Sequence, residues 1–189
     1  MRGHTDACSF PFTHEFQEKF GLSPSPDFVM LICYRNPDRV PTCVAPLSKI
    51  LQALSEAAIG ELQQSIYSIR TQGSFFVEHA LLGVPVITVH PQFGYQIRYS
   101  HSNVVAPGDD AKNAAITELE EHAIPACLVD VLMSPGDLLL INNRTALHGR
   151  RKVGDNTGPS SRWLQRVYAQ LSESPKLLVD PRVPYMLRP

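Results

Sequence analysis

The apolar positions of this chain fall into short runs that are separated by proline- and glycine-containing turns. The run at residues 28–33 predicts a buried strand over residues 27–34, because a short continuous apolar run bounded by turn residues is typical of one. Between two later runs, the sequence SPGD at residues 134–137 predicts a type II turn, which favours Pro and Gly at its central positions. Further strands are predicted at residues 40–44, 85–90, 96–102, 126–133, 138–142 and 162–171.

Helical spacing is confined to fewer segments. It predicts a helix over residues 48–58 capped by Ser48, a second helix over residues 60–70, and a third over residues 109–122 that Asp109 or Asp110 caps. Before the first strand, the pattern predicts an extended segment, a helical turn or loop, and a break, at residues 3–12, 13–20 and 23–26. Strands outnumber helices. The sequence therefore predicts a mainly β fold with peripheral helices (α+β), arranged as a double-stranded β-helix or jelly roll.

Size and charge exclude several classes of protein. The chain has 189 residues, which suits a single catalytic core over residues 1–189, and we expect residues 172–189 to form a C-terminal extension. Lys and Arg number 17 against 18 Asp and Glu, so the basic surface of a nucleic-acid-binding protein is absent. The apolar run at 28–33 is too short to cross a bilayer. No basic segment leads into an apolar stretch at the N-terminus, so we expect a cytoplasmic location.

Two potential metal ligands stand near the start of the chain, at His4 and Asp6. A spacing of two places both side chains on one side of an extended segment. With a second histidine from a distant strand they would form a facial triad of two histidines and one carboxylate, which leaves coordination positions open. A His-x-Asp pair is common by chance, and Asp6 could instead cap a following helix.

A second cluster lies near the other end of the chain. The sequence GDLLLINNRTALHGR contains His148, and Arg162 follows fourteen residues later. In a strand over residues 162–171, Arg162 and Arg166 would share a face with Leu164 and Tyr168. A buried arginine is costly without an anionic partner, and a ligand carboxylate would fit its planar guanidinium group. Two alternatives remain: an ion pair of Arg162 with Asp137 or Asp155, and a solvated rim position for Arg166.

Taken together, these motifs resemble a known family. Residues 136–168 resemble the C-terminal core of the clavaminate synthase-like branch of the taurine dioxygenase superfamily, which includes asparagine and arginine β-hydroxylases. The family pattern GDLL-x-x-DNxRxxHGR, followed by a loop and RWLxRVY, here reads GDLLLINNRTALHGR and SRWLQRVYA. The sequences HTD at residues 4–6 and DFVMLICYRNPD at residues 27–38 resemble the family's metal motif and the strand after it.

The resemblance implies a site and an activity. His4, Asp6 and His148 would hold Fe(II), and Arg162 would pair with the distal carboxylate of 2-oxoglutarate. Thr42 looks like the hydroxyl residue that assists Arg162, with an ordinary strand residue as the alternative. Arg166 would lie near the carboxylate of the substrate. The implied activity is a dioxygenase that uses O2, decarboxylates 2-oxoglutarate to succinate and hydroxylates a free or modified amino acid or a similar small molecule.

Two departures from the family pattern modify this prediction. Family members carry a long segment before the HTD motif, whereas this sequence has three residues there. We therefore expect a sheet that is incomplete at the N-terminus and that exposes an edge and apolar surface, which favours self-association. The alternative function is a truncated, catalytically inactive remnant that acts as a binding or interaction module. A cupin-like metal enzyme is a third reading, which Arg162 disfavours because that chemistry needs no partner for a distal carboxylate.

The second departure concerns the substrate. Relatives that hydroxylate arginine carry acidic residues just after the strand that here reads IRYSHSN, where this chain has Ser100 and Ser102. Without a carboxylate to hold a guanidinium group, we expect a neutral or modified amino acid rather than a basic one.

Overall fold

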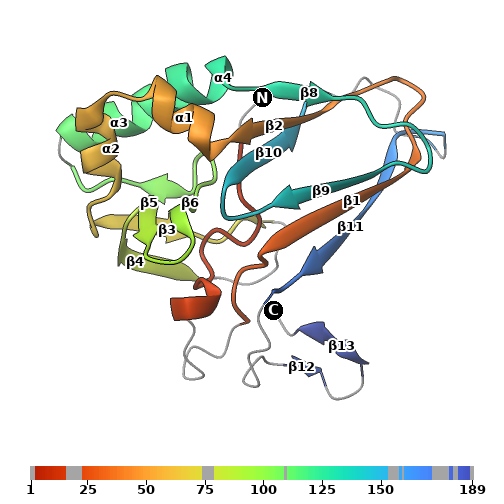
Figure 1. Ribbon diagram of the computed structural model, residues 1–189, viewed down its shortest axis with the longest axis horizontal. Coiled ribbons are helices and arrows are strands. Elements are labelled where there is room, and N and C mark those ends of the chain that lie inside the picture. The colour runs from red at the N-terminus through yellow and green to blue at the C-terminus, as the bar shows by residue number, and fades with distance from the viewer. Residues whose placement is uncertain are drawn as a thin grey trace.

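The computed structural model describes residues 3–15, 23–73, 79–108, 110–152, 158 and 160–171, together with the backbone of residues 179–180 and 183–187 (Figure 1). The predictions for residues 16–20, 74–78 and 109, for most of 154–161 and for most of 172–189 lie outside the described residues. The helical segments are η1 (Thr13–Glu15), α1 (Leu47–Ala53), α2 (Glu56–Leu62), α3 (Asp110–Glu118), the π-helical η4 (Leu119–Ala123) and α4 (Ile124–Ala126). The strands are β1 (Phe28–Arg35), β2 (Thr42–Pro46), β3 (Tyr67–Arg70), β4 (Ala80–Val84), β5 (Ile87–His90), β6 (Gly94–Ile97), β7 (Val104–Val105), β8 (Val129–Val131), β9 (Leu138–Asn142), β10 (Ala146–Arg150), β11 (Trp163–Ala169), β12 (Val179–Asp180) and β13 (Val183–Leu187).

Two antiparallel sheets form the centre of the fold, in the orders β11-β1-β9 and β10-β2-β8 (Figure 1). Along most of β1, partly exposed and buried positions alternate, as expected of a strand with one face against a core. Its buried residues pack with residues of β9 and β10, so the two sheets enclose a common core. The members of this core are Val29, Leu31, Cys33, Met133, Ile141 and Ala146. The predicted mainly β fold with a jelly-roll core is confirmed.

Helices α1 to α4, with η4, gather on one side of these sheets, where they cover a second and larger core (Figure 1). Leu47 and Ile50 of α1, Leu62 of α2 and Leu119 of η4 all point into it and are fully or almost fully buried. The predicted helix at 109–122 is confirmed over its described part, since α3 runs directly into η4. No helix in the described part of the chain is long and apolar enough to cross a membrane.

The helical prediction for residues 48–70 is wrong in two respects. The first helix ends at Ala53, and Ser55 caps a separate helix by accepting a hydrogen bond from the backbone of Ala58. Ser48 lies inside α1 and caps nothing. The carboxylate of Glu118 also accepts hydrogen bonds from the backbone N–H and the hydroxyl of Ser55, so a helix distant in sequence fixes the break.

The second helix of that prediction ends at Leu62, and the chain then becomes strand β3. This strand lies between β4 and β7, whose backbone groups complete its hydrogen bonds. Pairing with distant strands has therefore overridden the local helical spacing.

The extended segment predicted at residues 3–12 is also largely absent. Only His4 forms β-bridges, and the chain turns over residues 6–9. Ala7 adopts a φ of 52°, in the left-handed region that residues with a Cβ atom rarely occupy. Strand β10 was not predicted either, although it carries His148.

The turn at residues 134–137 is confirmed. Gly136 has a φ of +94°, and the backbone N–H of Asp137 donates to the carbonyl of Ser134 over 3.0 Å. The carboxylate of Asp137 accepts a further hydrogen bond from the backbone of Ser134. The turn lies between β8 and β9.

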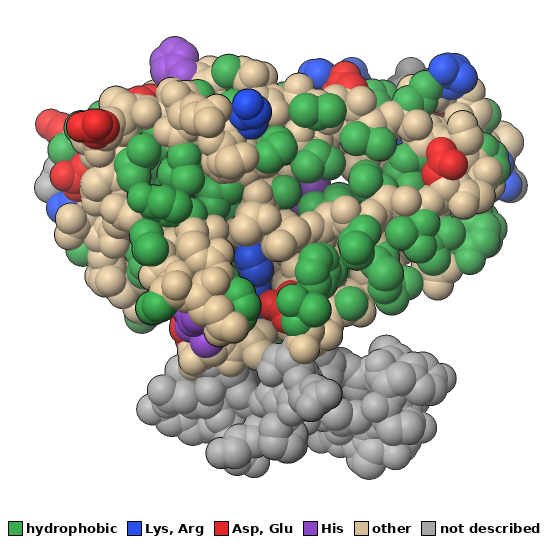
Figure 2. All heavy atoms as spheres, in the orientation of Figure 1, with side chains coloured by type: hydrophobic (Ala, Val, Ile, Leu, Met, Phe, Trp, Pro, Cys, Tyr) green, Lys and Arg blue, Asp and Glu red, His purple; other side chains and the backbone are tan. Residues whose placement is uncertain are grey.

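Beyond the core, the outer face of the β11-β1-β9 sheet is rich in exposed apolar side chains. Tyr34, Leu138, Leu140 and Trp163 are each about half exposed, and Figure 2 shows hydrophobic side chains gathered over these strands. The rings of Tyr34 and Trp163 stack with their centroids 4.7 Å apart. Such a surface suits association with other apolar surfaces, and the self-association expected from the sequence stays a prediction.

Two glycine substitutions should change stability in opposite directions. Gly136→Ala should lower the free energy of unfolding by about 1–2 kcal/mol, because alanine is strained at a positive φ. Gly60→Ala, inside α2, should raise it by about 0.5–1 kcal/mol, because alanine favours the helix. A Cβ atom meets nothing within 4 Å at either position, so steric clash does not contribute to either change in stability. Urea unfolding followed by circular dichroism measures both, and a Gly136→Ala protein as stable as wild type would contradict the strain argument.

Candidate metal centre

The centre of the site is a backbone pair between two histidines from opposite ends of the sequence. The N–H of His4 donates to the carbonyl of His148 over 3.0 Å, and the N–H of His148 donates to the carbonyl of His4 over 2.9 Å. This reciprocal bonding makes the two residues direct cross-strand neighbours. Their imidazole rings consequently lie side by side, with centroids 4.6 Å apart.

Asp6 joins the two histidines as a third potential ligand. Its Oδ1 lies 3.4 Å from Nε2 of His4, and its Oδ2 lies 3.5 Å from Nε2 of His148. One ligand atom from each of the three residues falls within 4.8 Å of the others, a spacing that could hold one metal ion. The structure thus brings together the three residues that the sequence proposed as ligands.

The electrostatics of these groups also suit a cation. Asp6 and His148 are almost fully buried. Burial raises the pKa of Asp6, but hydrogen bonds to His148 and His4 and the charge of Arg166 outweigh it and hold that pKa well below its ordinary value. Burial lowers the pKa of His148, which favours the neutral imidazole that a metal needs. The Nδ1 atom of His148 has no hydrogen-bond partner among the described residues.

Arg166 lies at the same centre. From β11, its Nη1 contacts both carboxylate oxygens of Asp6, at 2.7 and 2.8 Å. The sequence proposed Arg166 for a substrate carboxylate, with a solvated rim position as the alternative. Its side chain is 43% exposed, so it borders the solvent while pairing with Asp6.

Arg162 and Thr42 form a second pair, which joins β2 to the residue just before β11. A guanidinium nitrogen of Arg162 donates to Oγ1 of Thr42 over 2.9 Å, which brings together the two residues proposed for the cosubstrate. No carboxylate in the described part of the chain pairs with Arg162, and its Nε has no hydrogen-bond partner there. Burial, together with the like charge of Arg150, lowers its pKa. Asp137, one proposed alternative partner, bonds to Ser134 instead, and Asp155 lies outside the described residues.

Comparison with known proteins decides the family. The sequence model of the taurine catabolism dioxygenase TauD, TfdA family matches residues 6–168. The chain belongs to this family. An L-lysine 3-hydroxylase of Catenulispora acidiphila is 25% identical over 164 residues, which are 82% of this chain and 44% of that protein. Clavaminate synthase 2 of Streptomyces clavuligerus is 27% identical over 161 residues, 80% of this chain and 48% of that protein.

Solved structures share the fold of this TauD/TfdA family chain. An asparagine oxygenase in complex with Fe(II), 3-hydroxyasparagine and succinate superposes with a TM-score of 0.74 at 24% identity, covering 89% of this chain and 49% of that one. The non-heme iron oxygenase OrfP with Fe and alpha-ketoglutaric acid gives 0.68 at 26% identity, covering 89% and 48%. The chain spans about half the length of the curated relatives it matches.

Sequence reasoning assigned no role to Asn143, which contacts the backbone of the candidate ligand Asp6 in this TauD/TfdA family chain. Its side chain is 1% exposed and bonds to both backbone groups of Asp6. The signal available in the sequence was a pair of asparagines in the turn between a strand and His148. A buried amide must find hydrogen-bond partners, but the sequence does not say which ones.

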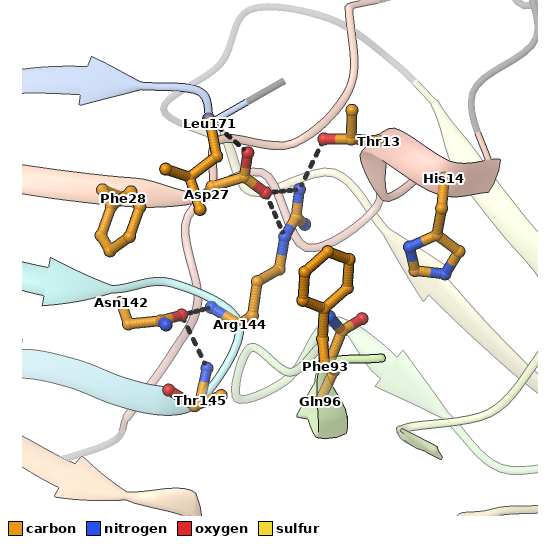
Figure 3. Close-up of a pocket in the computed structure, with 10 residues that line it drawn as sticks. All are labelled: Thr13, His14, Asp27, Phe28, Phe93, Gln96, Asn142, Arg144, Thr145 and Leu171. Carbon is orange, nitrogen blue, oxygen red and sulfur yellow. Dashed lines mark hydrogen bonds and ion pairs between the residues drawn. The ribbon is translucent and has the colours of Figure 1, made fainter. Parts of the chain in front are cut away.

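A separate cavity of about 460 Å³ opens beside η1 and the first residue of β1 (Figure 3). Arg144 lines it and donates to the carboxylate of Asp27 and the hydroxyl of Thr13. None of His4, Asp6 or His148 lines this cavity, so it is distinct from the metal centre.

Divalent metal should stabilise the protein through the three converging residues. At a free concentration of 100 times Kd, metal should add about 2.7 kcal/mol to the free energy of unfolding. For a chain of this size that is a rise in Tm of roughly 5–10 °C, which scanning calorimetry measures. His148→Ala should abolish the rise, and His122→Ala, which changes an exposed histidine outside the site, should keep it. A full rise in His148→Ala would exclude His148 as a ligand.

Proposed function

We propose that this chain carries the catalytic core of an Fe(II)- and 2-oxoglutarate-dependent oxygenase, in which His4, Asp6 and His148 hold the iron. The observation that carries the proposal is the convergence of two Nε2 atoms on one buried carboxylate. Two histidines and one carboxylate on one side of a metal leave positions open for other ligands. When bound, the iron supplies the activation of O2 that is coupled to decarboxylation of 2-oxoglutarate to succinate.

The Arg162–Thr42 pair supports 2-oxoglutarate as the cosubstrate. A partly buried guanidinium group without a carboxylate partner is costly, and the distal carboxylate of 2-oxoglutarate would neutralise it. The hydrogen bond to Thr42 holds the guanidinium group in place before the ligand arrives. The OrfP structure with Fe and alpha-ketoglutaric acid shows that a relative binds both partners.

An amino-acid-like substrate is the companion proposal. Relatives are named for lysine and asparagine, and OrfP has been solved with hydroxyarginine. Arg166 would hold the substrate carboxylate. The negative charge of Asp6 that now attracts Arg166 would be shared with a bound cation, which leaves the guanidinium group free for a second carboxylate.

A neutral or modified amino acid suits the site better than a basic one. Ser100 bridges to His4, which places this segment beside the metal centre. The nearby carboxylate of Glu120 already accepts from the hydroxyl of Tyr99 over 2.6 Å and pairs with His101 at 3.2 Å. Residues 97–103 contain no acidic side chain, and Glu120 beside them is engaged by Tyr99 and His101, so this part of the described chain offers no unengaged carboxylate for a guanidinium or ammonium group.

The inactive-remnant alternative is disfavoured by the same geometry. A binding module needs neither three converging potential metal ligands nor an arginine that has no carboxylate partner among the described residues, and these two features support the oxygenase instead. The location in the cytoplasm and the self-association expected from the sequence stay predictions.

An anaerobic titration with Fe(II) and 2-oxoglutarate tests the proposed function directly. Wild type should develop the weak visible charge-transfer band of the iron chelate. His148→Ala should lose metal and band together. Arg162→Ala should keep its metal affinity but bind 2-oxoglutarate at least about 30-fold more weakly, because a charged partner is removed. Thr42→Val should weaken 2-oxoglutarate binding by roughly 5–10-fold through one lost hydrogen bond.

The variants His148→Ala and Arg162→Ala show which residues the charge-transfer band depends on. A band of wild-type strength in Arg162→Ala would remove Arg162 from the cosubstrate site. A folded wild type that binds iron but never forms the band would move the remnant function ahead of the oxygenase.

Substrate binding through Arg166 can be tested once free amino acids have been screened for stimulated succinate release. With the best substrate, Arg166→Gln should raise KM by about 30-fold or more, because the substrate carboxylate loses its charged partner. The metal and 2-oxoglutarate affinities of the variant, measured in parallel, identify any indirect effect through Asp6. An unchanged KM would place the substrate carboxylate elsewhere.

A further inference from the structure

Asp6 stands in a turn whose backbone is bonded largely to residues distant in sequence, namely Asn143 and Gln72. The chain turns over residues 6–9 directly after the β-bridge of His4. Ala7, the next residue, has a φ of 52°, which is unfavourable for a residue with a Cβ atom. Such a conformation persists only where surrounding contacts impose it, so the position of the Asp6 carboxylate depends on what those contacts are.

The side chain of Asn143 supplies hydrogen bonds to the backbone of Asp6. Its Oδ1 accepts from the backbone N–H of Asp6 over 2.8 Å, and its Nδ2 donates to the backbone carbonyl of Asp6 over 2.9 Å. The same Nδ2 donates to the carbonyl of Pro26 over 2.9 Å. One carboxamide therefore bonds to both backbone groups of Asp6, as a neighbouring strand would, and uses both of its N–H groups.

Asn143 is itself held on a well-anchored turn between β9 and β10. Its backbone N–H donates to the carbonyl of Asp27 over 2.8 Å. On either side, Oδ1 of Asn142 accepts from the backbone of Arg144 and Thr145, and the guanidinium group of Arg144 pairs with Asp27 (Figure 3). The turn that carries Asn143 leads directly into the strand that carries His148.

We propose that Asn143 is a positioning residue that sets the place of the Asp6 carboxylate relative to His148, and so the affinity of the site for metal. The inference rests on the proposed function, because it assumes that Asp6 and His148 are metal ligands. Groups that orient a metal ligand typically change metal affinity by about 10–100-fold when they are removed. Asn143 acts here through the backbone of the ligand rather than through its carboxylate.

A matched control exists elsewhere in the same protein. Asn36 is also buried, and its Oδ1 accepts from the backbone N–H of Val40 over 3.0 Å. Its Nδ2 donates to the carbonyls of Val40 and Met133, at 3.1 and 3.0 Å. It thus makes the same three hydrogen bonds as Asn143, but to a loop that carries no proposed metal ligand.

Calorimetric titration of the metal-free protein with Co(II) alone tests the proposal in Asn143→Ala and Asn36→Ala. Both variants lose three buried hydrogen bonds, so both should have a similarly lowered Tm. Only Asn143→Ala should bind Co(II) about 10–100-fold more weakly than wild type. Asn36→Ala should stay within about threefold, and the visible Co(II) spectrum should change only in Asn143→Ala.

Two results would overturn the proposal: a Co(II) Kd for Asn143→Ala within about threefold of wild type, or an equal loss of affinity in Asn36→Ala. If Asn143→Ala does not fold, the pair Asn143→Ser and Asn36→Ser replaces it under the same limits, since serine leaves room for water. Wild type that binds no Co(II) would overturn the proposed metal site as well. If wild type binds Co(II), either of the two results above would overturn the positioning role alone.

Discussion

The reciprocal backbone pair between His4 and His148 is the constraint on which the site depends. Two hydrogen bonds join the beginning of the described chain to strand β10, and they align the two imidazole rings on the same side. Strand β10 is fixed in turn by its pairing with β2, whose first residue is Thr42. The same sheet therefore places both the histidine pair and the threonine that holds Arg162.

A buried negative charge is the second organising feature. Asp6 is 1% exposed, and a carboxylate so removed from water needs positive charge or several hydrogen bonds around it. Arg166 and the two histidines meet that need in the structure. A metal ion at the proposed site would meet that need more strongly, because its charge is larger than that of one side chain.

The outer face of the β11-β1-β9 sheet is a third feature of the structure. The chain spans about half the length of the relatives it matches, and the outer face of its β11-β1-β9 sheet exposes large apolar side chains. None of the apolar side chains of that face belongs to the three candidate metal ligands or to the Arg162–Thr42 pair. The candidate site and the exposed apolar face are thus formed by different side chains.

The sequence by itself determined the elements whose cause is local. The Pro-Gly turn at residues 134–137 and strand β1 follow from residue types and their spacing, and both are confirmed. It also nominated His4, Asp6, His148 and Arg162, because metal ligation and carboxylate recognition require particular side chains, while the resemblance to the family nominated Thr42. Tertiary structure decided the rest. The helix break at Ser55, the strand at residues 67–70 and the turn at Ala7 each depend on partners distant in sequence. The contact of Arg166 with Asp6 and the clamp of Asn143 on its backbone have the same origin, since hydrogen bonds between segments far apart in the sequence form only when the fold brings them together.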